Sequence, residues 1–486
     1  MLSLHMAEQP SSPFAELPDT EEWLQRINRA SVVSNVEQQL LDLALARQIR
    51  QALDTLREQA KTNPDYVHCH LYIEFEPKLL ALTGARASVL HLGRSSQDIL
   101  ATANSGMNRE RVVTLVQIIN DLIGELIELA KREKESVVPA YTNGVQAQPT
   151  LYSHYVLAHA HVFVRDVKRL QECYARFSQC PMGSGVCNGT GWPLDTTRMA
   201  QLLGYDATFD NAFDAGQCQG NDFPLELANI IVSLMLHVNQ FLSDFMVQYA
   251  QCRPWIRYGS QQGVYISSAM PQKRNPGIIN DCRRDAGLVI GSAFGVIERM
   301  QNLNLGMPDV RDNHTMLGLF QDAGQVIQVF ARIIRSLAVD KVRALEELQQ
   351  DWTCSQELAD TLVREATVDF RTAHQFASRL VTWARESAQT PETVTYENVV
   401  AVWETWAQDK AVPKTFPLSQ EGLRRALNPW TILQQRQTHG SASPSLLPEQ
   451  FQELELILSQ VKEWVGKTLQ FQSQIWSNLD YAIDQL

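Results

Sequence analysis

Long stretches of this chain carry apolar residues at three- and four-residue steps, and this period limits the fold more than any other feature. The positions from Val112 to Ala130 form one continuous apolar stripe, which is typical of an amphipathic helix. The segment from Leu225 to Val247 is apolar on more than one face, as expected for a helix inside a bundle. A third such pattern runs from Leu317 to Leu348. Helices of about 25–35 residues would be rods of roughly 40–50 Å.

Strand patterns with a period of two are nearly absent from the sequence, so we expect an all-α protein with a core of long helices. The length of 486 residues allows about three domains. A polar stretch from Gly259 to Pro276 separates two of the expected helices. Loops of this kind often carry function, because a rigid scaffold holds them in place.

The composition argues against several classes of function. The formal net charge of -12 disfavours nucleic-acid binding, which needs an excess of Lys and Arg. No apolar run reaches the ~20 residues of a membrane span and no secretory signal is visible, so we expect a cytoplasmic protein without a membrane partner. The eight cysteines are scattered, and neither they nor the histidines have the spacing of a metal site. We therefore expect no metal.

One loop carries a dense motif. The segment from Ile266 to Pro276 reads I-S-S-A-M-P-Q-K-R-N-P, which resembles the G-S-S-x-M-P-x-K-x-N-P signature of the fumarase/argininosuccinate lyase superfamily at every fixed position except the first. In that family the first serine of the pair removes a proton next to a carboxylate, and the Lys and Asn bind that carboxylate. The resemblance implies that Ser267 is the base and that Lys273 and Asn275 bind the substrate.

The chemistry explains why such a loop is polar. A serine alkoxide is too basic to persist in water, so it needs N–H donors and positive charge in a closed site. Lys273 and the loop backbone are suited to supply them. The resemblance also places Ser268 and Met270 against the substrate. The competing interpretation is a plain surface loop that leads into a helix at Pro276.

Two further segments match in the same order. His91 to Asp98 resembles the H-T-G-R-S-R-N-D of argininosuccinate lyases, and Tyr141 to Pro149 resembles their Y-T-H-L-Q-R-A-Q-P. Near the C-terminus, Val368 to His374 looks like their P-F-R-x-A-H. The resemblance thus covers nearly the whole chain and points to the argininosuccinate lyase branch.

This branch implies a specific architecture. It implies three helical domains, which we place at residues 1–94, 95–350 and 351–486, with the long-helix bundle and oligomer core in the middle. It implies a homotetramer whose active sites each draw the three signature segments from three different chains. The expected partner is a small carboxylate substrate, and we expect no cofactor.

Departures from the family pattern fall on the residues that read the substrate. The family's His after Thr142 is Asn143 here, and the Glu that holds that His falls on Asn280. Losing one partner would strand a polar group, whereas two amides can satisfy each other. We therefore expect a neutral hydrogen-bonded pair in place of a titratable one. The alternative is an alignment slip or an unrelated surface change.

The substrate grip is altered as well. The family's second Arg and its Asn align with Ser96 and Gln97, and the family's Tyr aligns with Arg311. Swapping Arg for Ser removes a bidentate donor for a carboxylate, so we do not expect cleavage of argininosuccinate. In addition to the residues of the signature loop, we assign catalytic roles to Thr142 and Asn143. The expected substrate contacts are Arg94, Ser95, Ser96, Gln97, Gln148 and Arg311.

The sequence thus predicts a carbon–nitrogen lyase that eliminates an amine from an N-substituted aspartate, or adds one in reverse. The proton donor is not identified, and His91 and His314 are candidates because they adjoin signature segments. One rival hypothesis keeps the serine loop but catalyses a different elimination or a cyclisation in a biosynthetic pathway. Another is a non-catalytic protein on the same scaffold.

Overall fold

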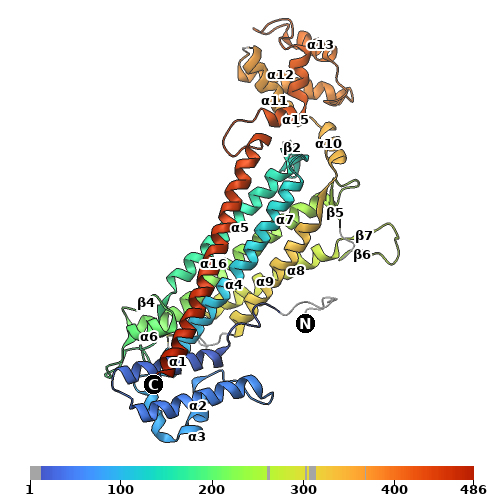
Figure 1. Cartoon of the computed structure of the whole chain (residues 1–486). Coiled ribbons are helices and arrows are strands. Elements are labelled where there is room, and N and C mark those ends of the chain that lie inside the picture. Colours follow the sequence, from blue (N-terminus) through green and yellow to red (C-terminus); the bar gives the residue numbers. More distant parts are fainter. Residues whose placement is uncertain (1–11, 260–262, 302–303, 306–313, 367) are drawn as a thin grey trace.

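The computed structural model describes residues 12–259, 263–301, 304–305, 314–366 and 368–486. The protein is a rod of long helices with a smaller group of helices at each end (Figure 1). The prediction of an all-α fold is confirmed. The rod consists of α4 (Ser96–Arg132), α5 (Tyr152–Arg176), α7 (Gln219–Tyr249), α8 (Gly277–Arg299), α9 (His314–Ser336) and α16 (Leu447–Asp484).

The apolar periods predicted the core of the rod correctly. On α4 the stripe from Val112 to Ala130 is buried against α5 and α9. On α7 the buried side chains include Leu227, Ile231 and Phe241. The helical stretch Asp214–Tyr249 is long and apolar enough to cross a membrane by length and composition. Most of its buried apolar side chains belong to the central hydrophobic cluster, so we assign it to the bundle core.

A second hydrophobic cluster lies at the N-terminal end of the rod. Trp23 and Phe75 are among its largest buried side chains. Trp23 also donates from Nε1 to Glu110 of α4 over 3.2 Å, which fixes this end to the bundle. The helices around this cluster are α1 (Thr20–Glu37), α2 (Leu43–Thr62), α3 (Tyr72–Thr83) and α6 (Thr196–Leu203).

A third cluster at the other end spans residues 352–432 and is centred on Phe376 and Trp403, whose rings meet edge to face. Its helices are α11 (Ser355–Ala366), α12 (Phe370–Glu386), α13 (Tyr396–Ala407), α14 (Gln420–Leu427) and α15 (Pro429–Gln434). The short α10 (Lys341–Gln349) connects this end to the rod.

The last helix does not stay with the third cluster. It runs back along the rod (Figure 1), and its Leu454 and Val461 join the bundle core, whereas Leu479 and Ile483 join the N-terminal cluster. The division of the chain into domains remains a proposal. This packing favours a third domain that ends before α16.

In the described part of the chain, eight short strands form four two-stranded pairs, which the helical pattern did not predict. Two of the antiparallel pairs are hairpins that carry predicted site segments. The pairs are β1 (Val137–Thr142) with β2 (Val145–Leu151), β3 (Gln179–Cys180) with β4 (Ala207–Thr208), β5 (Ile256–Tyr258) with β8 (Leu337–Val339), and β6 (Tyr265–Ile266) with β7 (Arg274–Asn275).

Candidate active site

The first predicted segment forms the start of α4. Ser95 is the N-cap residue, and its hydroxyl accepts a hydrogen bond from the Gln97 N–H over 3.2 Å. Asp98 completes a capping box by accepting from the Ser95 N–H over 2.9 Å. Such a box satisfies backbone donors that the first turn of a helix leaves free. The segment is therefore part of the scaffold, whatever else it contacts.

Asp98 reaches further than its own helix. It is fully buried, and its second oxygen accepts from the N–H groups of Gly183 and Gly185 over 3.2 and 3.0 Å. Burial raises the pKa of this carboxyl to about 6, although the backbone donors and Arg94 favour the ionised form. Asp98 was quoted in the motif but not assigned a role. The Ser95-x-x-Asp98 spacing is the signal that could have marked it.

The other residues of this segment are engaged inside the protein. Arg94 is buried and donates to the Leu90 carbonyl over 3.1 Å and to the Asn28 side chain over 2.9 Å. Gln97 donates to the Gly216 carbonyl over 2.6 Å. Ser96 is half-buried. The predicted substrate contacts of these residues remain predictions, and the guanidinium already has partners within the fold.

His91 lies against the same N-terminal cluster. Its ring stacks on Tyr72 with centroids 4.9 Å apart and an interplanar angle of 10°. Burial lowers its pKa, as does the charge of Arg94. A neutral, stacked imidazole suits packing at least as well as proton transfer. Its predicted role as a proton donor stays a prediction.

The second predicted segment is the β1–β2 hairpin. Thr142 pairs with Val145, and the two residues between them have positive φ, at 52° for Asn143 and 76° for Gly144. This is the geometry of a type I′ turn, for which Asn-Gly is the favoured pair. Asn143 therefore has a conformational reason to be Asn, in addition to any role in a site. Thr142 and Asn143 are both exposed at the tip.

Side chains of the second strand of this hairpin form hydrogen bonds with the helices at this end of the rod. Gln148 donates from its side chain to Gln356 on α11, and Gln146 donates to Glu347 on α10 over 2.7 Å. The predicted amide pair of Asn143 with Asn280 is not formed within one chain. Among the described residues no hydrogen bond joins these two exposed side chains.

The third segment is the β6–β7 hairpin, which projects from the side of the rod (Figure 1). Its loop folds back on Ser267, whose hydroxyl accepts from the N–H groups of Met270 over 3.1 Å and Ala269 over 3.4 Å. The Ser267 N–H donates to the Lys273 carbonyl over 3.3 Å. Backbone donors aimed at this oxygen would stabilise negative charge as it develops there.

The remaining signature residues surround Ser267 on the same loop. Ser268, Met270 and Lys273 are exposed. Asn275 donates one amide hydrogen to the Tyr265 carbonyl over 3.1 Å, across the base of the hairpin. An Asn side chain has two amide hydrogens, so this bond leaves one for another acceptor. Ser267, Lys273 and Asn275 thus lie on one short hairpin.

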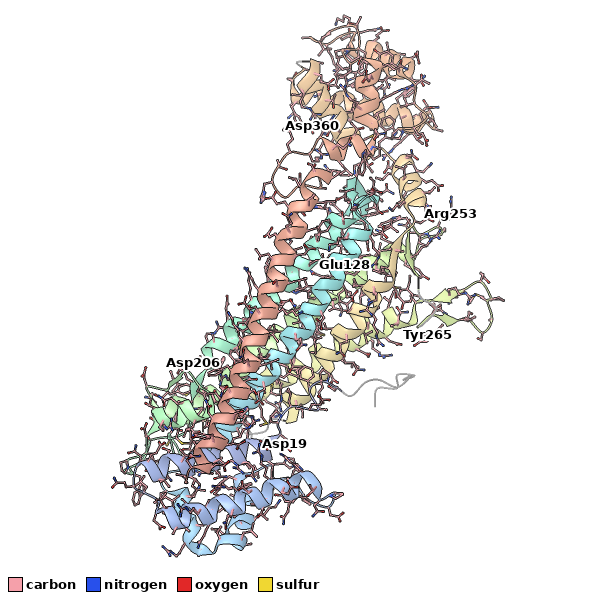
Figure 2. All side chains as sticks on the ribbon, in the orientation of Figure 1. Asp19, Glu128, Asp206, Arg253, Tyr265 and Asp360 are labelled. Carbon is pink, nitrogen blue, oxygen red and sulfur yellow. The ribbon has the colours of Figure 1, made fainter. Side chains whose placement is uncertain are left out.

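Tyr265 fixes the base of this hairpin (Figure 2). Its hydroxyl donates to Asp281 on α8 over 2.7 Å, and this bond raises the pKa of the phenol. A Cβ added to Gly277 would lie 1.9 Å from the Tyr265 ring, so only glycine leaves room for the ring. The sequence reading did not single out Tyr265 or Gly277, because their pairing depends on contact across the hairpin.

The three segments do not converge within one chain. The 37 residues of α4 separate the first segment from the second by about 55 Å at 1.5 Å per residue. The first lies beside α1, the second at the opposite end of the rod, and the third on its side (Figure 1). Arg311 and the side chain of His314 lie outside the described residues. Among the residues that are described, no group of three His, Cys, Asp or Glu side chains is placed to hold a metal.

Comparison with known proteins covers most of the chain. A family model described as lyase matches residues 15–291, and one described as argininosuccinate lyase C-terminal matches residues 352–433. The argininosuccinate lyase of Pseudoalteromonas atlantica is 31% identical over 77% of this chain and 80% of its own length. That of Bacillus subtilis is 31% identical over 68% and 72%.

Solved structures share the fold. A crystal structure of EDDS lyase in complex with formate superposes with a TM-score of 0.86 over 96% of this chain and 91% of its own, at 22% sequence identity. A fumarate lyase:delta crystallin from Brucella melitensis has a TM-score of 0.66 over 87% of this chain and 92% of its own, at 17% identity. The same arrangement of long helices therefore extends to proteins of low sequence identity.

Proposed function

This chain belongs to the lyase family of the argininosuccinate lyases, as a divergent member of the fumarase/aspartase superfamily, and from this premise we propose that it is a carbon–nitrogen lyase acting on an N-substituted aspartate. The observation that carries the proposal is the hairpin that holds Ser267, Lys273 and Asn275 together, with two backbone N–H groups on the Ser267 hydroxyl.

The proposed reaction starts with Ser267 as its alkoxide. The alkoxide takes a proton from the carbon next to a substrate carboxylate, and the electron pair of that C–H bond moves into the carboxylate. When the pair returns to form a carbon–carbon double bond, the C–N bond breaks and its electrons leave with the amine nitrogen, which takes up a proton. The products are an unsaturated dicarboxylate and an amine. The reverse sequence adds the amine.

Lys273 and Asn275 are proposed to bind the carboxylate that carries the transient charge. The Lys273 ammonium supplies positive charge, and the Asn275 amide retains one hydrogen for an acceptor after its bond to Tyr265. Both effects are strongest once water is excluded. The hairpin is exposed in a single chain, so a closed site requires further groups around it.

We propose that other copies of the chain supply these groups, in a homotetramer whose sites each use three chains. The separation of the three segments along the rod supports this assembly. The outer face of α8 supports it too, since Leu288 and Phe294 are 53% and 55% exposed there. Among the described residues, no atom outside the helix's own backbone lies within 4 Å of a Cβ added to Gly287, Gly291 or Gly295. Small and large apolar residues on one uncovered face suit close contact with another helix.

Argininosuccinate is not the substrate that we propose. Ser96 stands where the family has an Arg, and the Arg94 side chain has its partners inside the fold. The superposed EDDS lyase is named for a different substrate, so this fold supports lyases of more than one compound. We propose that this chain retains the loop that removes the proton and has a changed pocket for the amine. The existence of lyases with different substrates on this fold agrees with that proposal.

The test is a mass-spectrometric assay of the purified protein with fumarate and a panel of amines, with argininosuccinate cleavage measured in parallel. We expect N-substituted aspartates from some amines, and none from Ser267→Ala. Equal product from that variant would overturn the assignment of the base. An assembled protein that forms no product from any amine would overturn the proposed reaction and favour a different elimination, a cyclisation or a non-catalytic role.

A further inference from the structure

A cavity of about 540 Å³ lies beside the Asn143 turn, between the β1–β2 hairpin, the start of α5, the end of α7 and β5. This volume is in the range of small-molecule pockets. Its lining is mainly apolar and includes six aromatic side chains. The rings that line it are Tyr141, Tyr152, Tyr155, Phe241, Phe245 and Trp255.

Two residues of the lining carry buried polar atoms, but these atoms do not open into the cavity. Tyr152 and Trp255 are 2% and 3% exposed, and both line the cavity. Within the described part of the chain, the Tyr152 hydroxyl and the Trp255 indole N–H have neither a hydrogen-bond partner nor more than 1 Å² of accessible surface. The lining therefore offers a bound molecule its apolar surface rather than these two donors.

The charge of the lining selects the kind of molecule. Among the described residues around the cavity there is no Lys or Arg, and Asp244 is the one carboxylate. It lies at the exposed edge and accepts a hydrogen bond from the Tyr155 hydroxyl over 3.0 Å. His154 also lines the cavity, and burial lowers its pKa, which keeps it neutral at pH 7. The lining therefore repels anions.

We propose that this cavity binds a small organic ammonium ion with an apolar body. Aromatic faces attract cations through their quadrupoles, and Tyr and Trp do so well. Asp244 adds an opposite charge at the rim. The role of this ion as the amine partner of the reaction rests on the proposed function. The binding of the ion to the cavity does not depend on that function.

The test is calorimetric titration of the full-length protein with tyramine, whose ammonium and aromatic ring match these features. Its matched control is 3-(4-hydroxyphenyl)propionate, which has the same ring and a carboxylate in place of the ammonium. We expect tyramine to bind at least about tenfold more tightly. Equal affinities, or no saturable binding of tyramine, would overturn the proposal. Because no turnover is measured, this failure is separate from a failure of the lyase assignment.

Two isosteric variants locate the binding. Asp244→Asn removes the rim charge and should weaken tyramine about fivefold or more without changing the propionate. Trp255→Phe keeps an aromatic wall but replaces the indole with a weaker face for a cation, and should weaken tyramine more than the propionate. Asp206→Asn makes the same charge change at the other end of the rod (Figure 2) and should leave tyramine affinity unchanged. Tyramine binding that is unaffected by both cavity variants would contradict the site.

Discussion

The start of α4 and the β6–β7 hairpin both carry family motifs, but they are built in opposite ways. At the start of α4, Asp98 is fully buried and accepts three backbone hydrogen bonds, two of them from the distant Gly183–Gly185 turn. On the hairpin, the hydrogen bonds of Ser267 to other described residues all lie within its own loop. A family motif can thus mark a structural part of the scaffold or a part that is available to a substrate. Substitutions should tell the two apart, by stability in the first and by turnover in the second.

The largest expected effect tests the hairpin side of this comparison. Ser267→Ala removes the proposed base and should lower kcat about 10³-fold, while the free energy of unfolding changes by less than about 0.5 kcal/mol, as is usual at surface positions. Steady-state kinetics and urea unfolding measure the two quantities. Gln272→Ala, an exposed change on the same loop, is the control and should retain activity. A large loss of stability in Ser267→Ala would show that the loop is structural.

The second prediction tests the scaffold side. Asp98→Ala removes the acceptor of three backbone N–H groups at once, so we expect a loss of about 2–4 kcal/mol in the free energy of unfolding. Urea unfolding measures it. Asp210→Ala, an exposed change, should stay within about 0.5 kcal/mol of the parent. A stability loss as small as that of the control would remove the contrast between the two regions.

The sequence predicted some parts of the structure better than others. The long helices followed from apolar period, because a bundle needs a stripe on each rod. The Asn143-Gly144 turn was also readable, since Asn-Gly between two short apolar segments is a strong hairpin signal, but we interpreted Asn143 only as a replaced histidine. The course of α16 was not readable, because an amphipathic stripe does not say which surface covers it. The packing of the Tyr265 ring over Gly277 was not readable either, because it depends on a contact across the hairpin. The roles of the site residues remain predictions.

The third prediction sharpens the comparison within the hairpin. Gly277→Ala places a Cβ 1.9 Å from the Tyr265 ring, which should displace the base of the hairpin and lower kcat about tenfold, since small misplacements of a reacting group are costly. Trypsin should also cleave faster after Lys273 and Arg274. Gly318→Ala on α9 meets open space and is the control.

A companion variant separates the ring from its hydroxyl. Tyr265→Phe keeps the ring over Gly277 but loses the bond to Asp281, so it should fall between the parent and Gly277→Ala in both assays. Unchanged kinetics and unchanged cleavage in Gly277→Ala would mean that the base of the hairpin does not position Ser267.

The smallest expected effect is the pH dependence of the Asp98 network. Burial raises the pKa of Asp98 to about 6 in the folded protein, from an ordinary value of 3.8. The folded protein therefore holds a proton that the unfolded chain releases between these two values, and stability rises as the pH falls through 6. By linkage, the free energy of unfolding should gain about 1 kcal/mol between pH 7 and pH 5 from this one group. Urea unfolding at the two pH values, for the parent and for Asp98→Asn, isolates it.

Other groups also titrate over this range, but they are common to both proteins and cancel in the difference. Asn cannot take up the proton, so the stability advantage of the parent over Asp98→Asn should be larger at pH 5 than at pH 7. The opposite trend would mean that the three backbone donors outweigh burial and hold the carboxyl ionised. In that case Asp98 at the start of α4 would be a permanent anion whose hydrogen bonds come from the fold itself. On the hairpin, by contrast, the backbone donors would stabilise a negative charge on Ser267 that exists only during the reaction.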